Sequence, residues 1–236
     1  MAETPHFSHF VILLLMGSEF AVAVCVLTVI GAAIARRKSI ALLAAGVAVS
    51  VVAGYAGVLV GVGWMSGQKT LAPGQWKYFC EADCHIAYSI ESVAIGEDSG
   101  AAQKQPSSRN EQVAVVLKTW FDQNSIAPWR GNGPLTPSPR RVVLVDGRGA
   151  KYLPVPETAA AQGAPSTPMT QPLRPGEFYT TRFVFQVPRD ARDLRLLVAD
   201  TDPATNFIID HENSPLHGKI LLSLGDPAGP RSSLLQ

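Results

Sequence analysis

Two long apolar runs near the start of the chain limit its fold more than any other feature. Residues 10–35 contain a single charge, Glu19, and residues 40–64 contain none. Each run exceeds the roughly 20 residues that a helix needs to cross about 30 Å of hydrocarbon. A signal peptide would require basic residues before its apolar run, but no Lys or Arg precedes the first run. The sequence therefore predicts transmembrane helices at residues 10–35 and 39–65, joined as a hairpin.

The charges around these runs predict their orientation. Arg36, Arg37 and Lys38 lie between the two runs, and basic residues in short loops stay in the cytoplasm. We therefore expect a membrane protein whose N-terminal tail, residues 1–9, and whose chain after the second helix lie outside the cytoplasm. In a bacterium this means an inner-membrane protein with these parts in the periplasm. Basic and acidic residues balance in that outer part, so we expect no nucleic-acid groove.

Glu19 is the exceptional residue of the predicted hairpin. It lies about nine residues inside its run, near mid-membrane at roughly 1.5 Å per residue. A carboxyl at that depth is costly and is a functional hypothesis by default. If the hairpin folds about Arg37, Tyr55 shares the depth of Glu19 and can donate a hydrogen bond to it. One alternative is that the Glu19–Tyr55 contact holds the hairpin together. The other is that Glu19 contacts another subunit.

The second helix also carries two pairs of small residues, each with a spacing of four. They are Ser50 with Gly54 and Gly57 with Gly61. Such spacing lets helix backbones approach closely. It predicts tight packing within the hairpin or against another membrane protein.

From residue 71 the sequence changes to short apolar runs separated by Gly, Pro, Asn and Asp, which is typical of an all-β sandwich. Alternation with a period of two, as in Phe183, Phe185 and Val187, predicts one buried and one wetter face. The predicted strands are 76–95 (with a break allowed), 112–122, 141–146, 178–187, 194–199, 206–210 and 219–224. The predicted divisions are a linker at 66–75, the β-sandwich at 76–225 and a C-terminal tail at 226–236.

The stretch WKYFCEADCHIAYSI, residues 76–90, contains Cys80, Cys84 and His85. In one straight strand both cysteines would face the core and His85 would face outward. Residues four apart would then lie about 13 Å from each other, whereas a disulfide needs Cα atoms within about 7 Å. A turn at residues 81–83 would bring them together. The sequence leaves three alternatives open: a Cys80–Cys84 disulfide, which an oxidising compartment favours, two buried free thiols, or a metal site that includes His85.

Several segments of the outer part resemble a known family. LRPGE at 173–177, FQVP ending at Pro188 and LRLL at 194–197 resemble the last hairpin of bacterial extracytoplasmic immunoglobulin-like domains of the telokin-like type. WRGNGPLTPSPRRVVLVDGRGAKY (129–152) and HENSPLHGKILLSL (211–224) are similar to parts of uncharacterised, membrane-anchored bacterial proteins. The resemblance implies an all-β immunoglobulin-like sandwich after the two-helix hairpin. It implies a binding or adhesion module with no shared catalytic set.

The metal alternative has a resemblance of its own. Two membrane helices followed by a β-domain with Cys-x-x-x-Cys look like cytochrome c oxidase subunit II, which binds copper. That family carries its cysteine pair near the end of the β-domain, whereas Cys80 and Cys84 open this one. A copper site would have to recruit His211 or His217 from the far end of the chain.

The outer part offers one further candidate, the loop that starts at Trp129. Trp129, Arg130 and Asn132 form a possible binding loop, because aromatic and Arg side chains anchor interfaces. The sequence contains no phosphate-binding Gly-rich loop and no Gly-x-Ser-x-Gly elbow. We therefore expect no enzyme. The leading hypothesis is a membrane-anchored binding or accessory module that contacts a protein or an envelope component. The alternative is a copper- or thiol-handling redox accessory protein.

Overall fold

The computed structural model describes residues 9–81, 83–95, 110–126, 129–155 and 166–225, without the side chains of residues 9, 80, 81, 83 and 84. The chain divides into two compact units. Of the described residues, the helical unit contains 9–68 and 202–219, and the sandwich unit contains those of 69–201 and 220–225. The chain therefore passes between the units three times.

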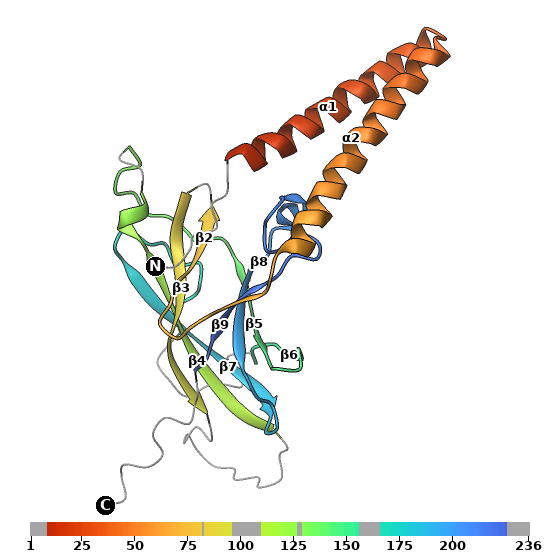
Figure 1. Cartoon of the computed structure of the whole chain (residues 1–236). Coiled ribbons are helices and arrows are strands. Elements are labelled where there is room, and N and C mark those ends of the chain that lie inside the picture. Colours follow the sequence, from red (N-terminus) through yellow and green to blue (C-terminus); the bar gives the residue numbers. More distant parts are fainter. Residues whose placement is uncertain (1–8, 82, 96–109, 127–128, 156–165, 226–236) are drawn as a thin grey trace, which may run out of the picture. The chain divides into compact units, whose positions relative to one another are not determined.

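The helical unit is built on two long helices, α1 (His9–Ile34) and α2 (Lys38–Met65) (Figure 1). Both are long and apolar enough to cross a membrane. The reversal between them occupies three residues. Arg36 lies there in the left-handed region with φ 54°, a conformation that ends a helix tightly. The turn thus keeps Arg36, Arg37 and Lys38 together at one end of the hairpin.

A second part of the helical unit comes from far along the chain. Residues Asp202–Lys219, called the collar below, begin with the short 3-10 helix η2 (Pro203–Phe207). The Asp202 carboxylate accepts a hydrogen bond from the Ala204 amide at 2.9 Å and caps this helix. The predicted strand at 206–210 is therefore wrong. An Asp followed by a Pro favours a helical start over an extended chain.

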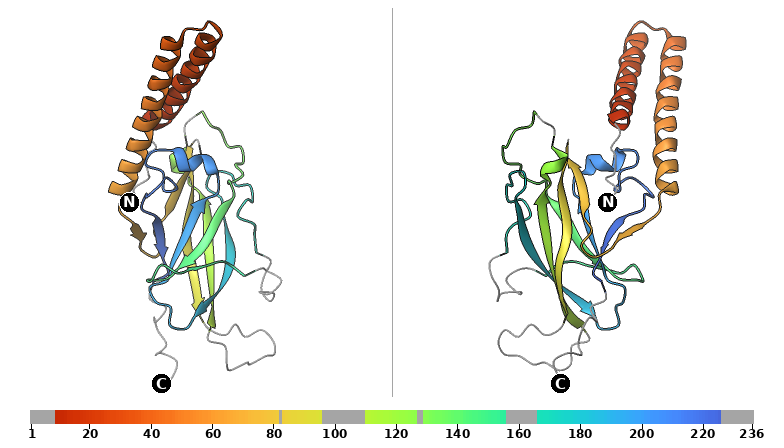
Figure 2. Two further views of the ribbon diagram at one scale, coloured as in Figure 1. Left: turned by 90° about the vertical axis from the view of Figure 1, so that its right-hand side faces the viewer. Right: turned by 60° about the vertical axis from the view of Figure 1, so that its left-hand side comes forward.

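The sandwich unit contains two sheets (Figure 2). One sheet has the order β1 (Lys69–Leu71), β9 (Ile220–Ser223), β8 (Arg195–Asp200), β5 (Arg140–Val145) and β6 (Lys151–Tyr152). The other has the order β2 (Lys77–Glu81), β3 (Asp83–Ile95), β4 (Asn110–Phe121) and β7 (Phe178–Pro188). β1 and β9 are parallel, and the other pairs are antiparallel.

The core lies between the two sheets, as the alternation predicted. Phe185 and Val187 on β7 are fully buried, and they pack with Leu196 and Val198 of β8. Phe183 lies against the same core. The buried apolar side chains of both sheets form one cluster, so the two sheets make a β-sandwich.

Two short strands were not predicted. β1 lies inside the stretch predicted as a linker, and β6 contains only two residues. Neither is long enough to show a hydrophobic period. β1 forms because residues 69–71 pair with residues 220–222, each 151 positions further along the chain, and no local pattern reveals this contact.

Candidate functional site

The stretch with the two cysteines forms a β-hairpin. Phe79 pairs with Ile86 and Glu81 pairs with Asp83, and the register shifts between these two pairs. One residue of β2, Cys80, therefore lies opposite two residues of β3, Cys84 and His85. This is the geometry of a β-bulge. The allowed break in the long predicted strand is thus a hairpin, and its backbone brings the three predicted ligands together.

The hairpin corrects the prediction of which side chains face the core. In one straight strand Lys77 and Phe79 would share the outward face predicted for His85. In the structure all three are buried, and Lys77 and His85 are only 3% and 2% exposed. The chain reversal and the bulge each change which alternate positions face inward. The side chains of Cys80 and Cys84 lie outside the described residues, so the disulfide, the free thiols and the metal site all stay predictions.

His85 is held in place by a hydrogen bond and a ring contact. Its Nδ1 lies 2.9 Å from the Ser125 hydroxyl, and its ring stacks on Phe121 with centroids 5.5 Å apart. The Ser125 hydroxyl donates its only proton to the Asp122 carbonyl at 2.8 Å. The two contacts hold the His85 ring and the Ser125 hydroxyl in place.

Asp122 connects the start of β2 with the end of β4. Its carboxylate accepts hydrogen bonds from the Tyr78 hydroxyl at 2.8 Å and from the Asn124 amide at 2.9 Å. Burial raises the pKa of Tyr78 to about 12, and the hydrogen bond to the Asp122 carboxylate raises it in the same direction. Tyr78 is therefore a neutral donor at physiological pH, and this contact stabilises the hairpin.

The predicted binding loop is fixed at its base and exposed at its tip. The Arg130 guanidinium lies over the Phe121 ring at 4.8 Å and donates to the Gly133 carbonyl at 2.8 Å. The Asn132 carbonyl accepts a hydrogen bond from Arg174 at 3.3 Å. Trp129, in contrast, is 87% exposed. The loop therefore presents a tryptophan to solvent from an anchored backbone.

Phe121 brings the two predicted sites together. The His85 ring and the Arg130 guanidinium both contact this buried ring. The cysteine hairpin and the Trp129 loop thus lie at the same end of the β2-β3-β4-β7 sheet. His85, Phe121, Trp129 and Arg130 all lie at this end. These residues are recognisable separately in the sequence, but nothing in the sequence indicates that they lie close together.

Two buried cations were missed by the sequence analysis. Lys77 donates to the carbonyls of Val198 at 2.6 Å and Ile220 at 2.9 Å. Arg140 forms an ion pair with Asp200, and its guanidinium lies over the Phe79 ring at 4.2 Å. These contacts join the two sheets, which supports a structural role. A period-two pattern assigns lysines to the solvent-exposed face of a strand, so it could not predict that Lys77 is buried.

The predicted polar pair of the hairpin has a different arrangement. The Tyr55 hydroxyl donates to the Phe207 carbonyl of the collar at 2.6 Å. No hydrogen bond joins Tyr55 to Glu19 within the described part of the chain, although the two groups interact electrostatically. The predicted Glu19–Tyr55 pair therefore stays a prediction.

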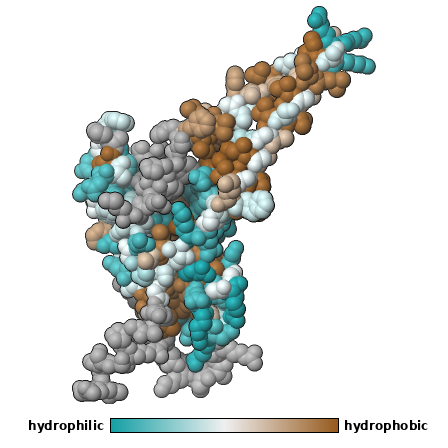
Figure 3. Space-filling view, viewed as in Figure 1, coloured by the Kyte–Doolittle hydropathy of each residue, from teal (hydrophilic) through white to brown (hydrophobic). Residues whose placement is uncertain are grey.

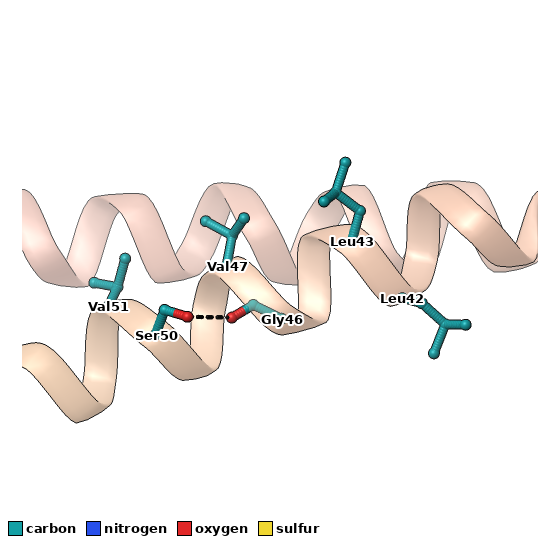
Figure 4. A pocket seen from close by; sticks show the side chains of 6 residues that line it. All are labelled: Leu42, Leu43, Gly46, Val47, Ser50 and Val51. Carbon is teal, nitrogen blue, oxygen red and sulfur yellow. Dashed lines mark hydrogen bonds between the residues drawn. The ribbon is translucent and has the colours of Figure 1, made fainter.

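A shallow apolar groove lies on α2 (Figure 4), and Ser50 is the one predicted small residue that lines it. Leu42, Leu43, Gly46, Val47, Ser50 and Val51 line it. The Ser50 hydroxyl donates to the Gly46 carbonyl at 2.9 Å, as the dashed line in Figure 4 marks. Its polar group is thus satisfied within the helix, which makes the groove suited to apolar contacts only.

Among the described side chains, no group of three or more His, Cys, Asp and Glu residues could hold a metal ion. His211 and His217, the distant histidines that a copper site would need, belong to the collar. The Nδ1 atom of His211 accepts from the Asn213 amide at 2.9 Å, and the Nε2 atom of His217 lies 3.2 Å from the Asp210 carboxylate. Both rings have local partners within the helical unit.

The sequence matches no known family model and no functionally curated protein. Among solved structures, the secreted protein MPT63 of Mycobacterium tuberculosis aligns over 66% of this chain and 97% of its own, with 11% identity and a TM-score of 0.38. A β-sandwich protein of Clostridium difficile 630 aligns over 67% and 95%, also with 11% identity and a TM-score of 0.38. A conserved hypothetical protein of Bacillus anthracis aligns over 54% and 88%, with 17% identity and the same TM-score. These similarities are too distant to transfer a function.

Proposed function

We propose that the protein is a membrane-anchored binding module. In this proposal α1 and α2 cross the bacterial inner membrane, and an immunoglobulin-like sandwich stands outside the cytoplasm. There the Trp129 loop contacts a protein or another component of the envelope. The proposal includes no catalytic residue.

The exposure of the helices is the observation that carries the proposal. The apolar stretch of α1 is 0% buried within the chain and that of α2 is 11% buried. Figure 3 shows the apolar surface gathered over these two helices. Each large apolar side chain left in water costs about 1.5–3 kcal/mol relative to burial. α1 and α2 contact each other, yet many of their large apolar side chains stay exposed. A lipid bilayer would cover this surface, which supports the proposed membrane crossing.

The basic turn supports the proposed orientation. Arg36, Arg37 and Lys38 lie together at one end of the hairpin, and short basic loops stay in the cytoplasm. Both helix ends away from the turn then lie outside. Because the chain enters the sandwich three residues after α2 ends, the sandwich lies on that outer side as well.

The Trp129 loop is the part of the sandwich best suited to a partner. A tryptophan that is 87% exposed gains from burial in a complex, and Trp and Arg dominate the energetics of protein interfaces. The contacts of Arg130 with Gly133 and Phe121 hold the loop before binding. Such preorganisation lowers the entropic cost of association.

Photocrosslinking in the native membrane tests the binding proposal. A photoreactive amino acid at Trp129 should form a discrete protein or envelope adduct, and the same residue at exposed Lys151 should not. The adduct should also weaken when Arg130→Ala loosens the loop. The absence of an adduct, or equal adducts at both positions, would contradict the proposal.

A second candidate function is a thiol or copper accessory activity at the hairpin. The backbone register that faces Cys80 with Cys84 and His85 supports it, because residues opposite each other across antiparallel strands lie about 4.5–5.5 Å apart. This is within reach of a disulfide.

Thiol titration and copper analysis of the full chain in detergent test this candidate. A disulfide predicts one reactive thiol after unfolding, that of Cys25, and three after reduction. A copper site predicts retained copper that Cys84→Ser abolishes. Three thiols without reduction, together with copper retention unchanged in Cys84→Ser, would remove the candidate.

A further inference from the structure

The collar is fastened to the last third of α2 at several points. Besides the hydrogen bond from Tyr55 to the Phe207 carbonyl, the Gly218 amide donates to the Ser66 hydroxyl at 2.8 Å. At Gly63 the helix and the collar touch so closely that a Cβ atom would lie 2.2 Å from the Pro215 carbonyl oxygen. The collar therefore covers α2 from the level of Tyr55 to its end.

The collar backbone is a series of turns. Amides of residues 205, 208, 211, 214 and 217 each bond to the carbonyl three residues earlier. Such turns satisfy only part of their backbone groups internally, and lipid-exposed irregular backbone does not occur within the hydrocarbon region. The collar, and the part of α2 that it covers, must therefore lie outside the hydrocarbon.

The length of α2 places the boundary at the same level. Lys38 to Tyr55 spans about 18 residues, or about 27 Å at 1.5 Å per residue, close to the roughly 30 Å of hydrocarbon. The remaining residues of α2, 56–65, rise about 15 Å further. They pass through the outer headgroup layer, which begins at the level of Tyr55. Tyr55 and Trp64 are residue types enriched in such interfaces.

Two exposed apolar side chains distinguish the collar from an ordinary surface loop. Phe207 is 61% exposed and Leu216 is 68% exposed, while Ile209 of the same segment is buried. Leu216 also adopts φ 62°, a left-handed conformation that a leucine rarely adopts and that costs energy. A strained leucine that contributes little burial to the fold is consistent with a contact outside the chain.

We infer that the collar, Asp202–Lys219, lies in the outer headgroup layer of the bilayer and contacts lipid through Phe207 and Leu216. The inference rests on the membrane crossing proposed above. The collar carries Asp202, Asp210 and Glu212 against one basic residue, Lys219. Its contact with lipid is therefore apolar and independent of anionic lipid.

This position also changes the expected environment of Glu19. Glu19 is as far from the basic turn on α1 as Tyr55 is on α2, and the two groups interact electrostatically. Both then lie at the outer edge of the hydrocarbon rather than at its centre. A carboxyl at that level is reached by water, which removes most of the cost of placing it in the helix.

Depth-dependent fluorescence quenching tests the inference. The full chain, with its three cysteines replaced by serine, is reconstituted in phosphatidylcholine vesicles. An environment-sensitive fluorophore is attached at Phe207→Cys or Leu216→Cys. Lys151→Cys is the exposed control on the sandwich, and Val49→Cys, at a 68% exposed position of α2, is the control within the span.

The collar sites should be quenched at least threefold more by a nitroxide near the lipid headgroup than by one deep in the acyl chain. Quenching should not change with 20% anionic lipid or with 0.5 M salt, and Lys151→Cys should be unaffected. Collar sites that behave like Lys151→Cys, or that are quenched more by the deep nitroxide, would overturn the inference.

The Val49→Cys control separates this outcome from failure of the membrane anchor. If Val49→Cys is quenched by the deep nitroxide while the collar sites are not quenched by the shallow one, the anchor stands and only the collar inference fails. If Val49→Cys is not quenched by the deep nitroxide, the proposed membrane crossing fails with it.

Discussion

The two units use the same kinds of apolar residue in opposite ways. In the sandwich unit Phe185 is fully buried, whereas in the helical unit Phe20 is 72% exposed. The sandwich removes its apolar side chains from water by packing one sheet on the other. The helices leave theirs on the outside and depend on their surroundings. The hydrophobicity of a side chain thus indicates that it avoids water. Whether protein or lipid surrounds it depends on the architecture.

The largest expected effect comes from exchanging one phenylalanine in each unit. Phe185→Ala should destabilise the sandwich by about 3–5 kcal/mol, because it leaves a cavity in the core. Phe20→Ala should change sandwich stability by less than about 0.5 kcal/mol. Denaturant titration of the detergent-solubilised chain, followed by near-ultraviolet circular dichroism, measures both. Similar losses in the two variants would contradict the division between the units.

A buried carboxylate sharpens the comparison through pH. Asp146 is fully buried and accepts hydrogen bonds from the amides of Arg148 and Ala150 and from the Tyr152 hydroxyl. Burial alone would raise the pKa of Asp146, but these hydrogen bonds and the Arg148 charge outweigh it and lower the pKa. A lowered folded-state pKa stabilises the fold above the unfolded value, 3.8, and this contribution is lost as the pH falls through the folded-state pKa.

We therefore predict that Asp146→Asn lowers the melting temperature of the sandwich by several degrees at pH 7 and that the difference from wild type shrinks below pH 3.8. The matched control is Asp190→Asn, an exposed partner of Arg148, which should have little effect. Thermal melts at pH 7, 4 and 2.5 measure both variants. A difference from wild type that grows on acidification would show that the sign is wrong.

Glycines of α2 provide a smaller and more local test. Gly63→Ala should displace the collar, at a cost of about 1–3 kcal/mol, because its Cβ would meet the Pro215 carbonyl. Gly61→Ala has nothing within 4 Å of its added Cβ and should leave the collar in place. Hydrogen exchange at the Gly218 amide, which is bonded to Ser66, should accelerate only in Gly63→Ala. Equal protection in both variants would contradict the packing of collar on helix.

The smallest effect is expected from removing one hydroxyl. Tyr55→Phe keeps the ring but loses the hydrogen bond to the Phe207 carbonyl, which contributes about 0.5–1.5 kcal/mol. Exchange should accelerate modestly in residues 203–208 and remain unchanged in β7. If β7 responds instead, Tyr55 acts on the sandwich rather than on the collar.

The sequence predicted the parts of this structure whose pattern repeats locally. The apolar runs predicted α1 and α2, and the alternation at residues 183–187 predicted the inner face of β7. The inward Lys77, the bulge at Cys80 and the strand β1 could not be predicted, because each depends on which distant segment pairs with it. A one-residue shift of register reverses every side chain of a strand.

The same limit applies to the candidate site and to the collar. Trp129 was found because an aromatic residue beside Arg in a Gly- and Pro-rich loop is a recognisable interface pattern. Its proximity to His85 through Phe121 has no sequence signal. The sequence pattern of the collar predicted a strand at 206–210, and the attachment of the collar to α2 joins residues 152 positions apart in the chain.

The central claim, that the helices cross a membrane and hold the sandwich outside, is tested most directly by labelling in intact cells. A membrane-impermeant maleimide is applied to a cysteine-free variant with Lys151→Cys in the sandwich or Ser39→Cys beside the basic turn. The account predicts that Lys151→Cys is labelled in intact spheroplasts and that Ser39→Cys is labelled only after permeabilisation. Labelling of Ser39→Cys from outside, or protection of Lys151→Cys until the membrane is opened, would contradict it.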